Sequence, residues 1–288
     1  MDPTRMLPPA LVESAKAYAA GVKTPVEPRN AATVVLLRPG ASAEPGELEV
    51  YLLRRHVAMA FAAGMSVFPG GGVDPKDADL PSSLWAGPTP QEWADRMGCT
   101  ADEAASLVCA AVRETFEESG VLLAGTAEAV LADTTGLEAE RAALESRELA
   151  FSTLLEERGW VLRTDLLAVL GGWLTPVFEP RRYRTWFFVA AMPAGQVTRD
   201  VSSESDQVTW MSLRQAIEAA DSGEMLLMPP TYATCCEFYA ARTPDEALAH
   251  AAQLPYEMIE PVAEGERLMI PERLVALGLE VGRQVHGL

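Results

Sequence analysis

The sequence predicts an α/β fold, and three observations support that prediction. Residues 31–38 and 48–55 are apolar runs rich in β-strand formers, separated by a polar loop, as in two neighbouring antiparallel strands. Residues 101–119 repeat apolar side chains every three or four positions, which is typical of an amphipathic helix. Residues 181–190 run from a basic cluster into a third apolar strand. With 288 residues, 49% of them hydrophobic, the chain is long enough to bury one sizeable core.

The chain divides into three expected parts. Residues 1–30 are rich in Pro and Ala with a weak pattern, and we interpret them as an N-terminal arm. Residues 31–220 form the main domain, with inserts at about 74–99 and 126–170. Residues 221–288 form a C-terminal extension of helices and a hairpin, packed on the same domain.

Further elements follow from end signals and composition. A Pro-rich and Gly-rich first insert should contain one short helix, and an Ala-rich, Glu-rich second insert should contain a helical hairpin. The glycines that follow residue 170 should end a helix and lead into a strand. The expected helices are residues 11–20, 90–97, 126–158 (as the hairpin), 164–170, 213–220, 230–241 and 244–253, and residues 258–270 should form a β-hairpin.

The helix over residues 101–119 carries a cluster of carboxylates near its end. Thr100 begins a capping box, and Gly120 suits the left-handed position just past a helix end. At about 100° per residue, the face with Glu114, Glu117 and Glu118 lies opposite the apolar stripe. Most acidic helix ends are simply solvated, and that interpretation stays open at this point.

The three carboxylates carry an electrostatic penalty that a metal would relieve. Like charges one turn apart destabilise a helix by roughly 0.2–0.5 kcal/mol per pair, and the helix dipole disfavours negative charge at this end. Carboxylate oxygens suit hard divalent cations. The cluster therefore predicts a site for Mg²⁺ or Mn²⁺.

The upstream segment 66–73, S-V-F-P-G-G-G-V, is an apolar run that enters a glycine loop. With the segment 113–121, R-E-T-F-E-E-S-G-V, it resembles the Nudix box, G-x5-E-x7-R-E-U-x-E-E-x-G-U with U apolar. The second half matches at every fixed position, whereas Ala105 stands where the first Glu is expected. About 40 residues separate the glycines from Arg113, where the compact motif has about 15.

The long interruption, together with residues 61–71, 173–176 and 184–188, is similar to the long-insert branch of the Nudix hydrolase superfamily, which includes the peroxisomal coenzyme A diphosphatases of animals. This resemblance implies a Nudix-type α/β/α sandwich with a mixed β-sheet. We expect the insert at 74–99 to be an excursion that leaves the Gly70 loop beside the end of the 101–119 helix.

The resemblance also implies a ligand set for the metal. Glu114, Glu117 and Glu118 would hold Mg²⁺ or Mn²⁺, together with the backbone carbonyl of Gly70. The metal would neutralise a diphosphate and lower the pKa of a water molecule that attacks phosphorus.

Catalytic roles are implied for Arg113, Glu114, Glu118 and Glu204. Arg113 would hold the glutamates by ion pairing, and a carboxylate of the box or Glu204 would accept the proton of the water. Glu204 lies in a segment similar to the late acidic loop of Nudix domains, although a plain surface acid is the alternative.

Three arginines within four residues, Arg181, Arg182 and Arg184, are candidates for substrate binding in this acidic chain. Arginine suits bidentate contacts with phosphate. The alternative is charge that faces solvent at the start of a strand.

The predicted function is hydrolysis of a nucleoside diphosphate linked to another moiety. The resemblance favours coenzyme A or acyl-coenzyme A, and ADP-ribose, NADH and nucleotide sugars stay open because the box reads only the diphosphate. A non-catalytic nucleotide sensor is the main alternative, and an α/β scaffold with an acidic helix is another. The intact R-E-x-x-E-E favours the enzyme, because ligand binding alone does not require it.

Composition limits the partners. The net charge of −18 and pI near 4.6 argue against nonspecific binding to nucleic acid or anionic membranes. The four cysteines lack zinc-site spacing, and no signal peptide or long apolar run is visible, so we expect a cytoplasmic protein. The oligomeric state stays open, a homodimer included.

Overall fold

The computed structural model describes residues 5–40, 47–57, 62–203 and 205–288. A mixed sheet runs through the molecule in the strand order β11-β3-β2-β10-β9-β12, with β10 parallel to β2, β12 parallel to β9 and the other neighbours antiparallel. Its strands are β2 (Arg29–Pro39), β3 (Leu48–Arg55), β9 (Leu167–Leu174), β10 (Tyr183–Ala191), β11 (Ser205–Ser212) and β12 (Met258–Ile259).

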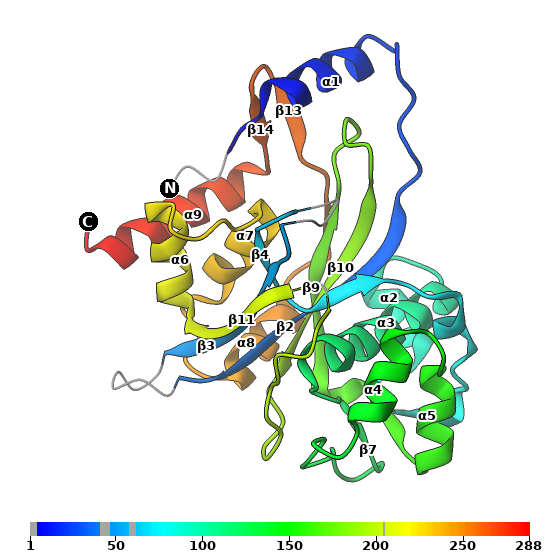
Figure 1. The fold of residues 1–288 in the computed structure, drawn as a ribbon. Coiled ribbons are helices and arrows are strands. Elements are labelled where there is room, and N and C mark those ends of the chain that lie inside the picture. The colour runs from blue at the N-terminus through cyan, green and yellow to red at the C-terminus, as the bar shows by residue number, and fades with distance from the viewer. Residues whose placement is uncertain (1–4, 41–46, 58–61, 204) are drawn as a thin grey trace.

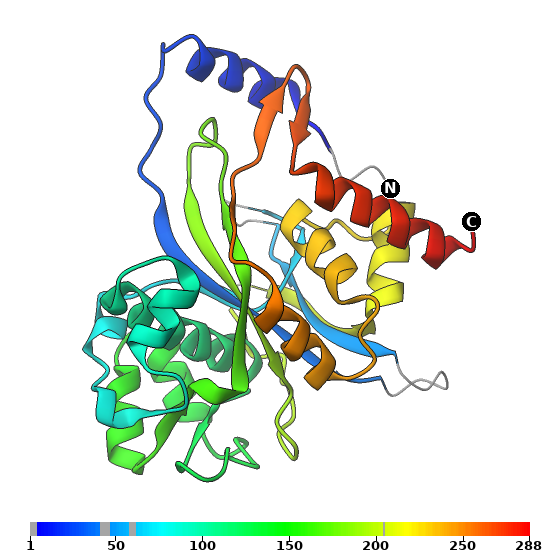
Figure 2. The same cartoon turned by 180° about the vertical axis from the view of Figure 1, so that it is seen from behind.

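Helices cover both faces of this sheet (Figures 1 and 2). One face packs against a lobe of α2 (Pro90–Met97), α3 (Ala101–Ser119), α4 (Glu138–Glu145) and α5 (Phe151–Arg158). The other packs against α6 (Leu213–Ser222), α7 (Pro229–Phe238), α8 (Pro244–Gln253) and α9 (Glu272–His286). The predicted α/β/α sandwich with a mixed sheet is therefore confirmed.

Alternation along the strands divides the core between the two faces. On β2, Val34 packs on the α3 side, whereas Val35 packs on the opposite side. On β10, Phe188 faces α3 and Phe187 faces the α7 side. Successive side chains of a strand point to opposite faces, so each central strand supplies both cores.

Two short strands place the glycine loop against the sheet. β4 (Ser66–Val67) pairs with β3, and β5 (Gly70–Gly72) pairs with β2. The first insert then continues through the 3-10 turns Pro75–Asp79 and Ser82–Leu84. It returns to the domain as α2, which matches the helix predicted over residues 90–97.

Two small sheets flank the central one. β6 (Trp85–Ala86), β7 (Ala124–Gly125) and β8 (Val161–Arg163) form a sheet within the helical lobe. β1 (Arg5–Met6) pairs with β14 (Arg267–Met269), which also pairs with β13 (Val262–Glu264). The N-terminal arm, with α1 (Pro9–Ala19), therefore joins the C-terminal hairpin (Figure 1).

Several predicted elements were wrong. The helix expected over residues 164–170 is a 3-10 turn (Thr164–Leu166) followed by β9, because the apolar run pairs with β10 and continues through both glycines. Residues 126–137 are not helical, and β12 joins the central sheet instead of the hairpin. Helix α9 was not predicted, because its start has Pro271 at the cap and no side-chain capping hydrogen bond.

All four cysteines are unpaired, and Cys109, Cys235 and Cys236 are buried. Within the described part of the chain, none of the helices combines the length and the apolar character needed to cross a membrane.

Candidate active site

The end of α3 is held by a buried arginine. Arg113 donates from Nε and Nη2 to the two carboxylate oxygens of Asp77, at 2.8 and 2.9 Å. Its Nη1 donates to Glu114 at 2.8 Å and to Glu117 at 3.0 Å, and Nη2 also reaches the carbonyl oxygen of Gly72 at 3.1 Å. One guanidinium therefore joins three carboxylates and the glycine loop.

The glycine loop lies directly against the end of α3. The Gly70 N–H donates to a carboxylate oxygen of Glu118 at 2.7 Å. At Gly70, a Cβ atom would collide with the backbone of Ala32 and Thr33, so only glycine lets the loop lie so close to β2. The excursion predicted for residues 74–99 is confirmed, because the chain leaves after the loop and returns to α3 with Gly70 beside Glu118.

The local signals at both ends of α3 act as predicted. The Thr100 side chain accepts a hydrogen bond from the Glu103 N–H at 3.2 Å, and Glu103 accepts one from the Thr100 N–H in return. Gly120 ends the helix in the left-handed conformation, with φ of 74°. These caps fix the two ends of α3, and the cap at Gly120 therefore fixes the last turn, which carries the carboxylate cluster.

The acidic face of α3 is not a solvated surface. Glu117 is 7% exposed and Glu118 is 8% exposed, because the first insert and β5 pack on this part of the helix. Burial raises the pKa of Glu114 to about 7 against the opposing attraction of Arg113, and burial also raises the pKa of Glu117. The simple interpretation as a solvated helix end is therefore wrong.

The charge balance of the cluster fits a bound cation. The carboxylates of Asp77, Glu114 and Glu117 surround the guanidinium of Arg113, and Glu118 adds a fourth carboxylate near the same end of α3. In this conformation Glu114 and Glu117 point to Arg113 and Glu118 points to Gly70, so among the described residues no three potential ligands converge on one point. The oxygen donors and the excess negative charge of this cluster suit a divalent cation.

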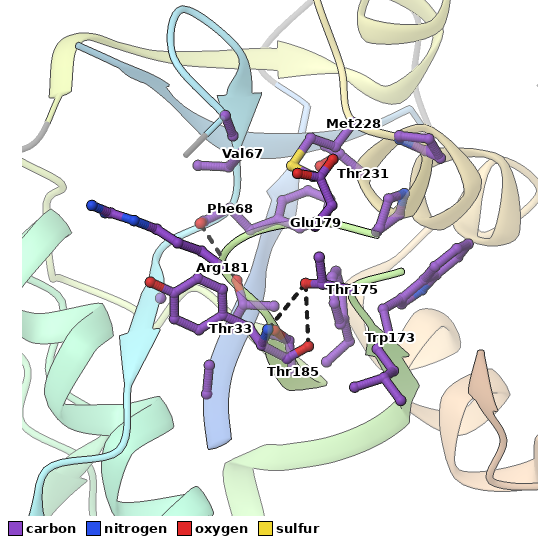
Figure 3. Close-up of a pocket in the computed structure, with 18 of the residues that line it drawn as sticks. Thr33, Val67, Phe68, Trp173, Thr175, Glu179, Arg181, Thr185, Met228 and Thr231 are labelled. Atoms are coloured by element: carbon purple, nitrogen blue, oxygen red, sulfur yellow. Dashed lines mark hydrogen bonds between the residues drawn. The ribbon is translucent and has the colours of Figure 1, made fainter. Parts of the chain in front are cut away.

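A cleft of about 420 Å³ opens beside this cluster (Figure 3). Gly70, Gly71, Gly72 and Glu114 form part of its wall, and strands β2 and β10 form its floor. Thr33 Oγ1 anchors the loop at the cleft by donating to the carbonyl oxygens of Pro69 and Phe68. The carboxylate cluster therefore borders a space that can hold a small molecule.

The three predicted substrate-binding arginines occupy different places. Arg181 lines the cleft. Arg182 is buried and donates to the carbonyl oxygens of Thr175 and Val26 and to Glu260, so it fixes the β9–β10 hairpin instead. Arg184 is not among the residues that line the cleft. It lies near Glu103, whose pKa is lowered mainly by the Thr100 hydrogen bonds and to a smaller extent by the charge of Arg184. The prediction for Arg182 is wrong, because its donors are taken up by protein groups.

Other residues reach the site without having been predicted. Asp77 is 1% exposed and carries the paired oxygens for Arg113. The segment D-P-K-D that contains Asp77 has the pattern of a helix start. That local pattern does not indicate an ion pair with Arg113, 36 residues further along the chain. Arg55 and Arg147 line the cleft from β3 and from the turn after α4, and no local pattern marks either one. Glu204 lies outside the described residues.

Residues 88–238 match the family model described as the NUDT19 Nudix domain. The fold also superposes on the crystal structure of a Nudix hydrolase from Alicyclobacillus acidocaldarius, with a TM-score of 0.67 and 30% identity, over 78% of this chain and 96% of that one. The chain belongs to the Nudix hydrolase family. Members of this family generally use divalent metal ions.

Two named relatives are the acyl-coenzyme A diphosphatases NUDT19 of Xenopus laevis and Gallus gallus. They are 25% and 29% identical to the chain over 233 and 232 residues, each over 67% of this chain and over 60% and 61% of their own lengths. The putative nudix hydrolase 7 of Caenorhabditis elegans is 27% identical over 63% of this chain and 52% of its own length. The chain thus spans between about half and three fifths of these relatives.

Proposed function

We propose that the chain is a divalent-metal-dependent diphosphatase that cleaves the diphosphate bond of a nucleoside diphosphate linked to another moiety. The observation that carries this proposal is the buried carboxylate cluster around Arg113, placed at a glycine loop on the wall of a cleft. The names of two relatives favour coenzyme A or acyl-coenzyme A as substrate.

In this proposal Glu114, Glu117, Glu118 and the carbonyl oxygen of Gly70 hold Mg²⁺ or Mn²⁺. Such an ion supplies charge neutralisation at the diphosphate and lowers the pKa of a water molecule. Arg113 sets the starting orientation of Glu114 and Glu117 through its Nη1 group.

Other side chains provide the remaining functions in this proposal. Arg181 and Arg147 face the same space as Glu114 and offer guanidinium donors to phosphate oxygens. Glu118, Glu114 or Glu204 accepts the proton of the attacking water as phosphorus is attacked in line. The second phosphate then leaves with the other half of the substrate.

The test is the substitution Glu118→Gln, which keeps side-chain volume and removes one negative charge from the site. Turnover of coenzyme A, ADP-ribose and NADH is measured with Mg²⁺, with Mn²⁺ and with EDTA. We expect a fall of at least ~10²-fold, the scale for one well-placed electrostatic or proton-transfer group. Glu157→Gln, at an exposed position on α5, is the matched control and should keep wild-type turnover.

Near wild-type turnover by a folded Glu118→Gln protein would refute the proposed site. A wild-type protein that binds metal and nucleotide but cleaves no diphosphate would favour the nucleotide sensor. The substrate panel with EDTA controls therefore separates the enzyme from the binding module.

A further inference from the structure

A second carboxylate, which does not belong to the carboxylate cluster of α3, lines the cleft. Glu179 lies on the turn that joins β9 to β10, and both Glu179 and Arg181 line the cleft. Figure 3 shows the Glu179 carboxylate directed toward Met228 and Thr231 at the start of α7, whereas Arg181 extends in a different direction. Glu179 was not among the predicted site residues.

The turn that carries Glu179 is held in place by hydrogen bonds. The Glu179 N–H donates to the carbonyl oxygen of Pro176 at 3.1 Å, and Ser14 Oγ from α1 donates to the carbonyl oxygen of Phe178 at 2.9 Å. The Thr175 N–H donates to the carbonyl oxygen of Tyr183 at 2.9 Å and closes the hairpin. The backbone position of Glu179 is therefore set by the fold.

No hydrogen bond or ion pair reaches the Glu179 carboxylate from the part of the chain that the structure describes. Arg182, three residues away, donates to Glu260 at 2.8 Å. The neighbouring helix α7 begins with Pro229 and Pro230, which have no N–H to donate. Burial raises the pKa of Glu179, since half-burial of this group is not offset by a cation.

The cleft that Glu179 lines is mainly apolar. Its lining includes Trp173, Phe178, Phe187, Met228 and Leu268, and Met228 lies beside Glu179 in Figure 3. A carboxylate in such a wall accepts hydrogen bonds from N–H and O–H groups and repels anions. Because the described protein groups give this half-buried carboxylate no hydrogen bond, a ligand that displaces its water gains affinity if it brings an N–H or O–H donor.

We propose that this apolar end of the cleft, with Glu179, receives the uncharged amide- and hydroxyl-bearing arm of the substrate and excludes a negative charge from it. The inference rests on the proposed diphosphatase function and adds an orientation to it. The diphosphate lies at the Gly70–Gly72 and Glu114 end, and the uncharged arm, with any acyl group that it carries, lies at the Glu179 end. The preference for an uncharged arm then comes from repulsion between the Glu179 carboxylate and an anionic group, as well as from favourable contacts with the arm.

The experiment compares two thioesters of equal chain length. Pentanoyl-coenzyme A has a neutral acyl end and glutaryl-coenzyme A has a carboxylate there. For the wild type, kcat/KM for the pentanoyl ester should exceed that for the glutaryl ester by at least ~10-fold, which corresponds to about 1.4 kcal/mol. Glu179→Gln keeps an acceptor oxygen and the side-chain volume. In this variant kcat/KM for the glutaryl ester should rise until the two esters differ by no more than about threefold. The control Glu157→Gln should keep the wild-type ratio.

A wild-type ratio in a folded Glu179→Gln protein would overturn the inference while leaving the diphosphatase intact. If the wild type cleaves neither ester, turnover of coenzyme A, ADP-ribose and NADH decides whether the proposed diphosphatase function fails, and the affinities of the same two esters for each protein are measured by calorimetry. A pentanoyl preference that Glu179→Gln abolishes would still support the selective end of the cleft. Equal affinities, or no binding of either ester, would overturn it.

Discussion

Asp77 is expected to be a large stability determinant, although it belongs to an insert. It is 1% exposed and accepts two hydrogen bonds from Arg113 and one from the Asp74 N–H at 2.8 Å. Asp77→Asn keeps the shape, but its amide nitrogen would face a guanidinium nitrogen and its charge would be lost. Hydrogen bonds to charged groups contribute about 1.5–3 kcal/mol each, and breaking a buried pair costs about 3–5 kcal/mol. The substitution also removes the repulsion between Asp77 and the carboxylates of Glu114 and Glu117, which offsets part of this cost. We therefore expect the free energy of unfolding to fall by about 3 kcal/mol.

The measurement is thermal and urea unfolding of metal-free protein in EDTA. A loss of about 3 kcal/mol should lower the melting temperature by roughly 6–12 °C in a chain of this size. Asp79→Asn is the matched control, because Asp79 is exposed in the same 3-10 turn and should melt within about 1 °C of the wild type. If Asp77→Asn melts like Asp79→Asn, the insert does not anchor Arg113 and the reasoning fails.

Three further predictions concern the metal, pH and the core. Mg²⁺ or Mn²⁺ should raise the melting temperature through binding to the folded state, and the double substitution Glu114→Gln/Glu118→Gln should abolish that shift; an unchanged shift would place the metal elsewhere. Without metal, the stability contribution of Glu114 should be lost as pH rises from 4.5, its ordinary pKa, toward its folded value of about 7. That loss is on the order of 3 kcal/mol. Urea titrations at pH 5 and pH 8 should show it as a fall in the free energy of unfolding of the wild type, and the fall should be smaller in Glu114→Gln. An equal free energy of unfolding of the wild type at both pH values would contradict the prediction. Phe116→Ala should destabilise by ~3–5 kcal/mol because Phe116 is fully buried, and a melting temperature like that of the wild type would contradict its place in the core.

Local signals explain why the sequence predicted α3 and its carboxylates so closely. The capping box at Thr100, the apolar stripe and the glycine at position 120 each depend on neighbours within four residues. The Nudix box resemblance then supplied the link between Gly70 and Glu118, and their 2.7 Å hydrogen bond agrees with it.

Features set by distant parts of the chain were harder to predict. The run that precedes Gly171 has the composition of either a helix or a strand, and only pairing with β10 decides for β9. Arg182 is held away from the cleft by an ion pair with Glu260, 78 residues away, whereas Arg181 lines the cleft. Strand alternation places Arg184 on the face of the sheet opposite the cleft. The sequence marks the three arginines alike because these partners are not local.

The geometry of Arg113 connects the insert to the proposed chemistry. Asp77 accepts hydrogen bonds from Nε and Nη2 of Arg113, and the carbonyl oxygen of Gly72 accepts another from Nη2. These bonds hold the guanidinium on its side away from α3. Only Nη1 faces Glu114 and Glu117, and these two carboxylates can therefore turn toward a metal without releasing Arg113 from the loop. A compact box places its glycines close to the arginine in sequence. Here about 40 intervening residues separate them, and Asp77 near the start of that stretch holds both ends together. The interruption of the motif is thus compatible with an assembled site because the inserted segment itself supplies the anchoring carboxylate.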